Sequence, residues 1–294
     1  MPAQLKTLLL LFGRFPVWMR WLAAGSVVCL VILGGLLLFM RFTRPHMRGF
    51  AAFHRGNYAE ALKEWSPLAN SGNADAQYGL GILYRDGLGL AQNHSAMIKW
   101  FTAAAEQGHV AAQYNLGNAY AAGLGVPVND REAFKWVRKA ADQGLAPAET
   151  FLGVMYFTGR AGSQDYAEAS TWWRKAADQG EAQAQAALGH LYANGQGVAH
   201  DLAEAVKWTR LAAEQGNAEA QFNLGAAYLN GSGTSRDPVQ AFAWCSLSAT
   251  AGYQNALDCK QIASQMLNAE ELVKATRLSG QYEKQYRSRD AKPK

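Results

Sequence analysis

Apolar residues recur at helical spacing through residues 109–144. Side chains three or four residues apart share one face of a helix. On this basis the first part of the segment predicts a helix over 111–122, whose apolar positions are Ala111, Ala112, Leu116, Ala119 and Tyr120. The second part predicts a helix that stops at Gly144, with apolar positions at Ala133, Trp136, Val137, Ala140 and Ala141.

Turn signals separate these two helices. Gly123 follows the first helix, where a left-handed residue commonly ends a helix and glycine adopts that conformation without a clash. Pro127 lies in the loop beyond it, and Asp130 is the predicted N-cap of the second helix. Each unit is therefore predicted to be two antiparallel helices joined by a glycine-rich loop. Gly117 lies within the first helix, and we expect close helix packing to offset its cost of about 1 kcal/mol relative to alanine.

The same pattern repeats every 36 residues without insertion or deletion. Three sets of residues mark the period: Gly72, Gly108, Gly144, Gly180, Gly216 and Gly252; Tyr84, Tyr120, Tyr156, Tyr192 and Tyr228; and Trp100, Trp136, Trp172, Trp208 and Trp244. A fixed period of this size is typical of a solenoid whose units bury their apolar faces against each other. The predicted fold is all-α, an α/α superhelical solenoid.

The repeated residues also resemble a known family. The run A-x-A-Q-x-x-L-G-x-x-Y-x-x-G-x-G, followed by A-x-x-W and A-A-[DE]-Q-G, is similar to the Sel-1-like repeat, a relative of the tetratricopeptide repeat. Its copies include ADAQYGLGILYRDGLG from Ala74, AQYNLGNAYAAGLG from Ala112, AQAALGHLYANGQG from Ala184 and AQFNLGAAYLNGSG from Ala220. The copy from Ala146 departs most, with Pro147 in its first turn, Glu149 in place of glutamine and Ala161 in place of the second glycine. The resemblance covers roughly residues 50–285.

The ends of the array are atypical, as the ends of solenoids usually are. Residues 41–72 are interpreted as a linker and an N-terminal half-repeat, in which Phe50, Ala51 and Phe53 belong to a degenerate first helix. Five repeats span 73–252, and capping helices span 253–286. Asn268 and Glu271 form a capping-box pattern before the last of these helices. Residues 287–294 are a basic tail.

Residues 21–40 predict a transmembrane helix behind an N-terminal tail (1–20). The stretch between Arg20 and Arg41 has no charged residue and has about the length that a helix needs to cross a bilayer. A cleaved signal peptide is the alternative, but its apolar region is usually shorter and is followed by small residues. The cationic flanks are nearly equal. Because long domains cross largely regardless of charge, we favour a bacterial inner-membrane protein with its repeats on the periplasmic side.

Charge is distributed unevenly along the chain. The net charge is +5, yet residues 1–48 contain six basic residues and no acidic one, which leaves 22 basic and 23 acidic residues in 49–294. The repeats are therefore nearly neutral. This argues against a nucleic-acid partner, since such a partner would require a basic face on the folded part.

Candidate chemistry is sparse. The GxG loops follow helices and lack the third glycine of a dinucleotide site, so they are interpreted as turns. The six histidines show no i, i+4 pair typical of a helical zinc site. No nucleophile stands beside an oriented base. We therefore predict no enzyme activity, no cofactor and no metal.

Three cysteines occur, and Cys29 lies in the predicted span. Cys245 and Cys259 are each seven residues from Gly252 on flanking helices, so they lie at similar heights in an antiparallel pair. A disulfide follows if the array faces an oxidising compartment. We favour the alternative of two small buried thiols, because cysteine is commonly buried without a partner.

Unrepeated positions on the first helix of each unit are the candidate partner-binding residues, because packing does not fix them. These are Tyr78, Ile82, Arg85, Tyr114, Asn118, Val154, Phe157, His190, Phe222 and Leu229. They are expected to line a concave wall that takes an extended or helical peptide; ordinary packing between helices is the alternative for the aromatic ones. The resemblance implies a membrane-tethered adaptor that binds other proteins. A regulatory or substrate-recruiting subunit of an envelope enzyme or transport complex, and an enzyme with an unrecognised site, are the other hypotheses.

Overall fold

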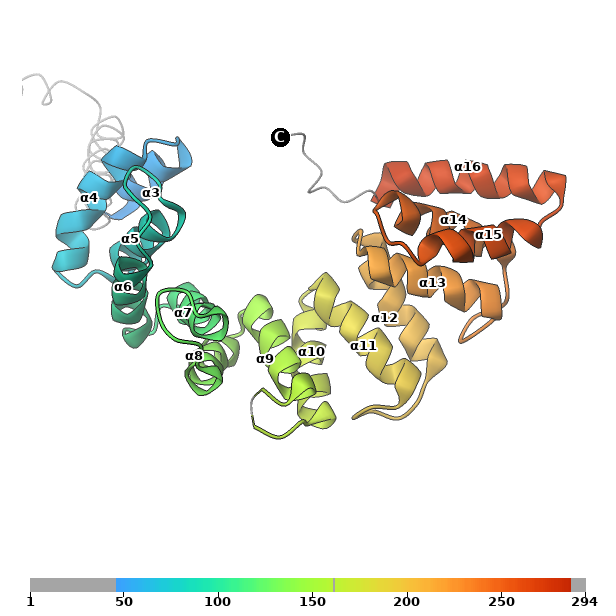
Figure 1. The fold of residues 1–294 in the computed structure, drawn as a ribbon, viewed down its shortest axis with the longest axis horizontal. Coiled ribbons are helices and arrows are strands. Elements are labelled where there is room, and N and C mark those ends of the chain that lie inside the picture. The colour runs from blue at the N-terminus through green and yellow to red at the C-terminus, as the bar shows by residue number, and fades with distance from the viewer. Residues whose placement is uncertain (1–45, 161, 287–294) are drawn as a thin grey trace, which may run out of the picture. The chain divides into compact units, whose positions relative to one another are not determined.

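The computed structural model describes residues 46–160 and 162–286, and their regular secondary structure consists of fourteen α-helices (Figure 1). The transmembrane helix predicted at 21–40 lies outside these residues. None of the helices that the structure describes combines the length and the apolarity that a membrane crossing requires.

The chain divides into two compact units, Met1–Gln92 and Asn93–Lys294. The first contains α3 (His46–His54), α4 (Tyr58–Asn70) and α5 (Ala74–Asp86). The second contains α6 (His94–Glu106), α7 (Val110–Ala122), α8 (Asp130–Asp142), α9 (Ala146–Thr158), α10 (Tyr166–Asp178), α11 (Ala182–Asn194), α12 (Leu202–Glu214), α13 (Ala218–Asn230), α14 (Pro238–Thr250), α15 (Ala256–Gln265) and α16 (Ala269–Tyr286).

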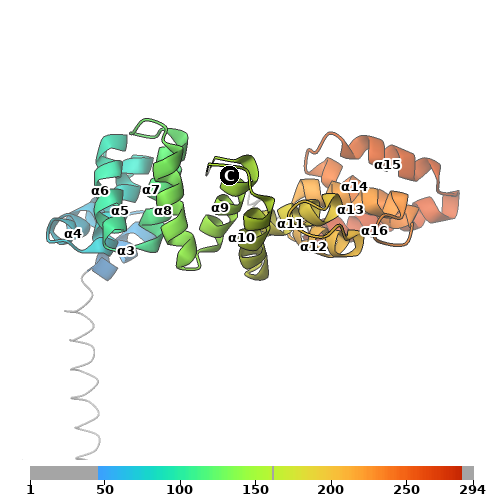
Figure 2. The same ribbon diagram turned by 90° about the horizontal axis from the view of Figure 1, so that it is seen from below.

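Helix pairs build the second unit. We call α7, α9, α11 and α13 the first helices, and α8, α10, α12 and α14 the second helices. Each first helix packs against the second helix of its own repeat and against the helix just before it in the chain. Figures 1 and 2 show these pairs succeeding one another. The periodicity thus predicted the helices and their pairing correctly.

Helix ends follow the turn chemistry, with one correction. Gly123 ends α7 in the left-handed region at φ 73°. The second helix of that repeat is capped by Asn129, whose side chain accepts from the backbone N–H of Glu132 at 3.1 Å. Asp130, predicted as the cap, is instead the first helical residue. Both residue types cap helices well, and the register decides between them.

Close packing explains the mid-helix glycines. A Cβ on Gly117 would lie 2.6 Å from Val137 Cγ2 and 3.2 Å from the Ala133 carbonyl oxygen. The repeated tryptophans fill the remaining volume; Trp136, Trp172 and Trp208 are at most 6% exposed. Helix backbones can therefore approach only where the first helix carries no side chain.

In the first unit, Trp65 has the same packing role. It is 1% exposed and makes an edge contact with Phe50, ring centroids 5.0 Å apart. A Cβ on Gly79 would meet its ring at 2.7 Å. The degenerate first helix predicted around Phe50 is α3, and it covers this tryptophan.

The C-terminal end is closed by α16, which packs against α14. Arg138 and Arg174 lie over the rings of Trp172 and Trp208, at 4.9 and 4.8 Å from the ring centroids. Trp244 at the end of the series is covered differently. Tyr282 and Tyr286 of α16 lie 4.5 and 5.4 Å from its ring. The predicted capping box starts this helix: Asn268 and Glu271 exchange two hydrogen bonds of 2.9 Å.

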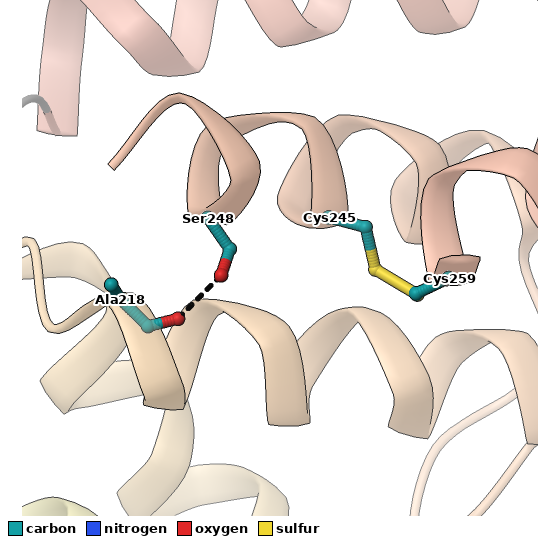
Figure 3. Close-up of a disulfide and its surroundings, with 4 residues drawn as sticks. All are labelled: Ala218, Cys245, Ser248 and Cys259. Carbon is teal, nitrogen blue, oxygen red and sulfur yellow. Dashed lines mark hydrogen bonds between the residues drawn. A yellow bond between two sulfur atoms is a disulfide. The ribbon is translucent and has the colours of Figure 1, made fainter. Parts of the chain in front are cut away.

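Cys245 and Cys259 are joined by a disulfide between α14 and α15 (Figure 3), with Cα atoms 6.0 Å apart. This differs from the two separate thiols favoured above. The two residues lie opposite each other because they are equally far from the turn at Gly252. On the same helix, Ser248 Oγ donates to the Ala218 carbonyl at 2.6 Å and ties α14 to α13.

Candidate functional site

Three adjoining cavities follow the first helices of the second unit. One of about 250 Å³ lies between α7, α9 and the start of α11. The next, of about 460 Å³, lies between α9, α11 and the start of α13 and shares Thr150, Val154 and Gln183 with the first. A third of about 260 Å³ lies between α11, α12 and α13 and shares His190 and Asn223 with the second. We call these three cavities together the groove.

Helical register brings the lining residues to one face. On α13 the groove is lined by Glu219, Asn223, Ala226 and Asn230, whose spacing of three to four residues places them on one stripe. The opposite stripe carries buried residues such as Leu224. The repeat therefore conserves the packing face of each helix and leaves the groove face free to vary.

Five of the predicted partner-binding residues line the groove. Tyr114 and Asn118 lie in the first cavity, Phe157 in the second, and Val154 and His190 where neighbouring cavities meet. Val154 is 37% exposed. The structure thus brings together side chains from three successive repeats. We propose below that they form a binding surface.

The other five predicted residues do not line the groove. Tyr78, Ile82 and Arg85 belong to α5 in the first unit, where the Arg85 guanidinium pairs with Asp86 at 2.8 Å. Two lie in α13.

The two residues in α13, Phe222 and Leu229, pack toward the C-terminal end of the array. The Phe222 ring lies 5.2 Å from that of Tyr253. Leu229 is 8% exposed and belongs to a buried cluster with Phe242 and the disulfide. Leu229 is therefore a core residue, which corrects its inclusion among the surface positions. It packs there against residues of α14 and α15.

Among the groove residues that were missed are the polar ones Glu181, Gln183, Glu219 and Asn223. Gln183 and Glu219 occupy the same position of successive repeats, one helical turn before the row that contains Tyr114 and Phe222. Extending that row by one turn toward the helix N-terminus would have found both.

Polar groups in the groove have unused hydrogen-bonding capacity. Thr150 is 6% exposed, and its Oγ1 has no hydrogen-bond partner among the described residues. The side-chain amides of Asn118, Gln183 and Asn223 likewise form no hydrogen bond within the described part of the chain. By contrast, Asn194 bonds to the backbone of its own helix at 2.8 Å. Amides carry two donors and an acceptor each, so the groove can bind a polar ligand.

Charge differs between the two kinds of helix. The first helices of the second unit contain no lysine or arginine. Their acidic positions in the groove are Glu219 and the N-cap residue Glu181. The second helices α8, α10 and α12 carry the cations: Arg131, Lys135, Arg138, Lys139, Arg174, Lys175, Lys207 and Arg210. The charged side chains that the first helices and their N-caps bring to the groove are therefore acidic.

One ionisable group is buried next to the groove residue Thr150 in the sequence. Glu149 is 3% exposed. Burial raises its pKa above the ordinary value, and the charge of Lys175 and a hydrogen bond from Gln179 act in the opposite direction. No group of three or more metal-binding side chains occurs among the residues described.

The fold and the groove define a class: an α-helical repeat protein whose array presents adjoining cavities along its first helices. The sequence profile of the Sel1 repeat matches residues 74–109, 110–145, 146–181, 182–217 and 218–253. The chain therefore belongs to the Sel1 repeat family. A comparison with curated proteins gives no match.

Several solved structures are similar to this chain. A Sel1 repeat protein from Oxalobacter formigenes is 33% identical, with a TM-score of 0.69, covering 85% of this chain and 99% of its own. A protective antigen of uropathogenic Escherichia coli is 27% identical, with a TM-score of 0.43, covering 82% of this chain and 68% of its own. An immunity protein from Pseudomonas aeruginosa is 21% identical, with a TM-score of 0.42, covering 75% of this chain and 88% of its own.

Proposed function

We propose that this protein is a non-catalytic scaffold that holds a segment of another protein in the groove. Sel1 repeats are suited to protein–protein interaction. The observation that carries the proposal is the run of unpartnered amides and exposed apolar side chains through three adjoining cavities. Gln183 and Asn223 are exposed, so a bound segment can reach their amides.

We also propose that the scaffold is tethered to the inner membrane through residues 21–40, with its repeats in the periplasm. The support is the uncharged stretch of 20 residues between Arg20 and Arg41. Fusions of a periplasm-active and a cytoplasm-active reporter to the C-terminus test the orientation. Activity of the periplasmic reporter is expected; activity of the cytoplasmic one would reverse the orientation. Recovery of the protein after alkaline washing of membranes tests the tether itself.

Capture of partners from membranes tests the scaffold function. The full chain and its Val154→Arg variant are crosslinked in membranes and purified. Val273→Arg is the matched control, because Val273 is an exposed helical valine (59%) on α16, outside the groove. We expect one partner set that Val154→Arg loses and Val273→Arg keeps. Recovery of only the chain itself would contradict the scaffold and indicate a homo-oligomer.

A further inference from the structure

We propose that the segment held in the groove is extended and carries lysine or arginine side chains that bind Glu181 and Glu219. This inference rests on the proposed binding function and specifies the chemistry of the partner. Its warrant is the charge of the groove, its unpartnered amides and its apolar centre.

The two carboxylates are free to bind an added cation. Neither Glu181 nor Glu219 forms an ion pair or a side-chain hydrogen bond with another described residue. Since α7, α9, α11 and α13 lack lysine and arginine, a bound basic residue meets no competing or repelling cation on these helices. An acidic segment would be repelled by Glu181 in the first cavity and by Glu219 in the second.

Glu181 occupies a position that usually has a structural role. In the corresponding position of other repeats, His109 and Asn217 cap their helices by accepting a backbone N–H. Glu181 is the N-cap of α11 and makes no such bond. Its carboxylate instead belongs to the lining of the first cavity. Glu219 is likewise not needed for capping, because Asn217 caps α13.

The free amides favour an extended backbone. Asn118, Gln183 and Asn223 can each donate to a peptide carbonyl and accept from a peptide N–H. An extended segment exposes both groups at every residue, whereas a helix bonds them internally. The three amides lie in successive cavities along the groove, so one strand can meet them in turn.

One apolar residue lines both of the cavities that contain the acidic residues. Val154 is shared by the first cavity, which contains Glu181, and the second, which contains Glu219 and Phe157. We therefore expect the partner to carry an apolar side chain close to its basic ones.

A peptide selection tests the inference. Random dodecapeptides displayed on phage are selected against the full chain purified in mild detergent, and the enriched peptides are measured singly by fluorescence anisotropy. The variants are Glu181→Gln with Glu219→Gln, Glu181→Lys with Glu219→Lys, and Val154→Arg, with Val273→Arg as control. Thermal unfolding of each variant verifies the fold, which does not depend on the two free carboxylates.

We expect enriched peptides to carry more lysine and arginine than the input library. Their affinity should fall about 3- to 30-fold in the double glutamine variant, the range for two exposed charge pairs. The double lysine variant should select acidic peptides instead. N-methylation of single peptide bonds should weaken binding, because it removes a backbone donor.

Two results would overturn the inference while leaving the proposed function intact. One is a set of peptides lost in Val154→Arg but without basic enrichment. The other is a set of peptides with apolar residues at helical spacing. In this set, N-methylation would weaken binding only for peptides that circular dichroism shows to be helical. Peptides that bind Val154→Arg as well as the native chain would instead overturn both the inference and the groove as the binding site.

Discussion

Gln179 Nε2 donates a hydrogen bond to Glu149 Oε2 over 2.7 Å, linking a second helix to the first helix of the same repeat. The flanking repeats form the same link between two glutamines: Gln143 donates to Gln113, and Gln215 to Gln185, both at 2.8 Å. This row of side-chain hydrogen bonds is a regular part of the array, and Glu149 is its one acidic member in α7, α9, α11 and α13.

Glutamate in place of glutamine at position 149 removes a hydrogen-bond donor from this row. Gln113, Gln185 and Gln221 each donate from Nε2 to the carbonyl eight residues earlier, at 3.1–3.2 Å. An ionised Glu149 has no hydrogen to give to the corresponding carbonyl, that of Ala141. A protonated Glu149 has one. We therefore predict that Glu149→Gln raises the free energy of unfolding near neutral pH by about 1 kcal/mol, the usual net value of one hydrogen bond.

The stability of the native chain should depend on pH through the same group. Because burial raises the pKa of Glu149 in the folded state, the folded protein binds its proton more tightly than the unfolded chain. The contribution of this group to the free energy of unfolding is fully present below its pKa in the unfolded chain. It is lost as the pH rises through its pKa in the folded protein. Thermal midpoints of native and Glu149→Gln chains should therefore diverge with rising pH. Parallel profiles would contradict this account.

Thr150→Val separates binding from stability. The change keeps the shape of a 6% exposed side chain and removes an Oγ1 without a hydrogen-bond partner among the described residues. We expect unfolding free energy to stay equal or rise by about 1–2 kcal/mol, since an unsatisfied buried hydroxyl is lost. Affinity for groove-binding peptides should fall, because Thr150 lines two cavities. Calorimetry and anisotropy measure the two effects; unchanged affinity would remove Thr150 from the binding surface.

Two glycine substitutions should act in opposite directions. Gly117→Ala places a methyl group 2.6 Å from Val137 Cγ2, and we predict a loss of about 2–3 kcal/mol from overpacking. Gly280 lies inside α16 with nothing within 4 Å of a built Cβ. Gly280→Ala should add about 1 kcal/mol from helix propensity alone. Urea unfolding measures both, and a neutral Gly117→Ala would show that the helices are less tightly packed.

The cysteine pair gives a test of the disulfide that also reports on which compartment holds the repeats. Of the three cysteines, Cys29 lies outside the described residues, so a Cys29→Ser background isolates Cys245 and Cys259. Thiol labelling of the unfolded chain should find none before reduction and two after. With the two cysteines separated by 14 positions in the sequence, reduction should lower the free energy of unfolding by about 3 kcal/mol. Two free thiols in protein taken from membranes would contradict a periplasmic array.

Much of the fold could be predicted because the repeat reports each packing position several times. Gly117, Trp136 and their counterparts are identical from copy to copy, because each copy packs these residues in the same environment. The cap at Asn129 was misplaced by one residue, since Asp130 beside it has the same propensity. The hydrogen bond between Gln143 and Gln113 was missed, because a glutamine that is repeated looks the same whether it is buried or solvated.

The groove was predicted less completely for a related reason. Asn118, Val154 and His190 vary between copies, which marked them as free of packing. Variation alone did not distinguish His190, which is exposed, from Leu229, which is buried by the C-terminal helices rather than by a regular repeat. Glu181 was missed because it lies at the N-cap of α11, where the local sequence suggests a capping hydrogen bond. In the structure its side chain makes no such bond.

The most direct test of the account is site-specific photocrosslinking in membranes. A photoreactive residue is placed at positions 154 and 223 in the groove, and at positions 139 and 175 on the exposed sides of α8 and α10. The account predicts one common partner band from both groove positions, competed by a groove-binding peptide, and no such band from the other two. A partner crosslinked from positions 139 and 175 but not from 154 and 223 would show that the protein binds through its second helices.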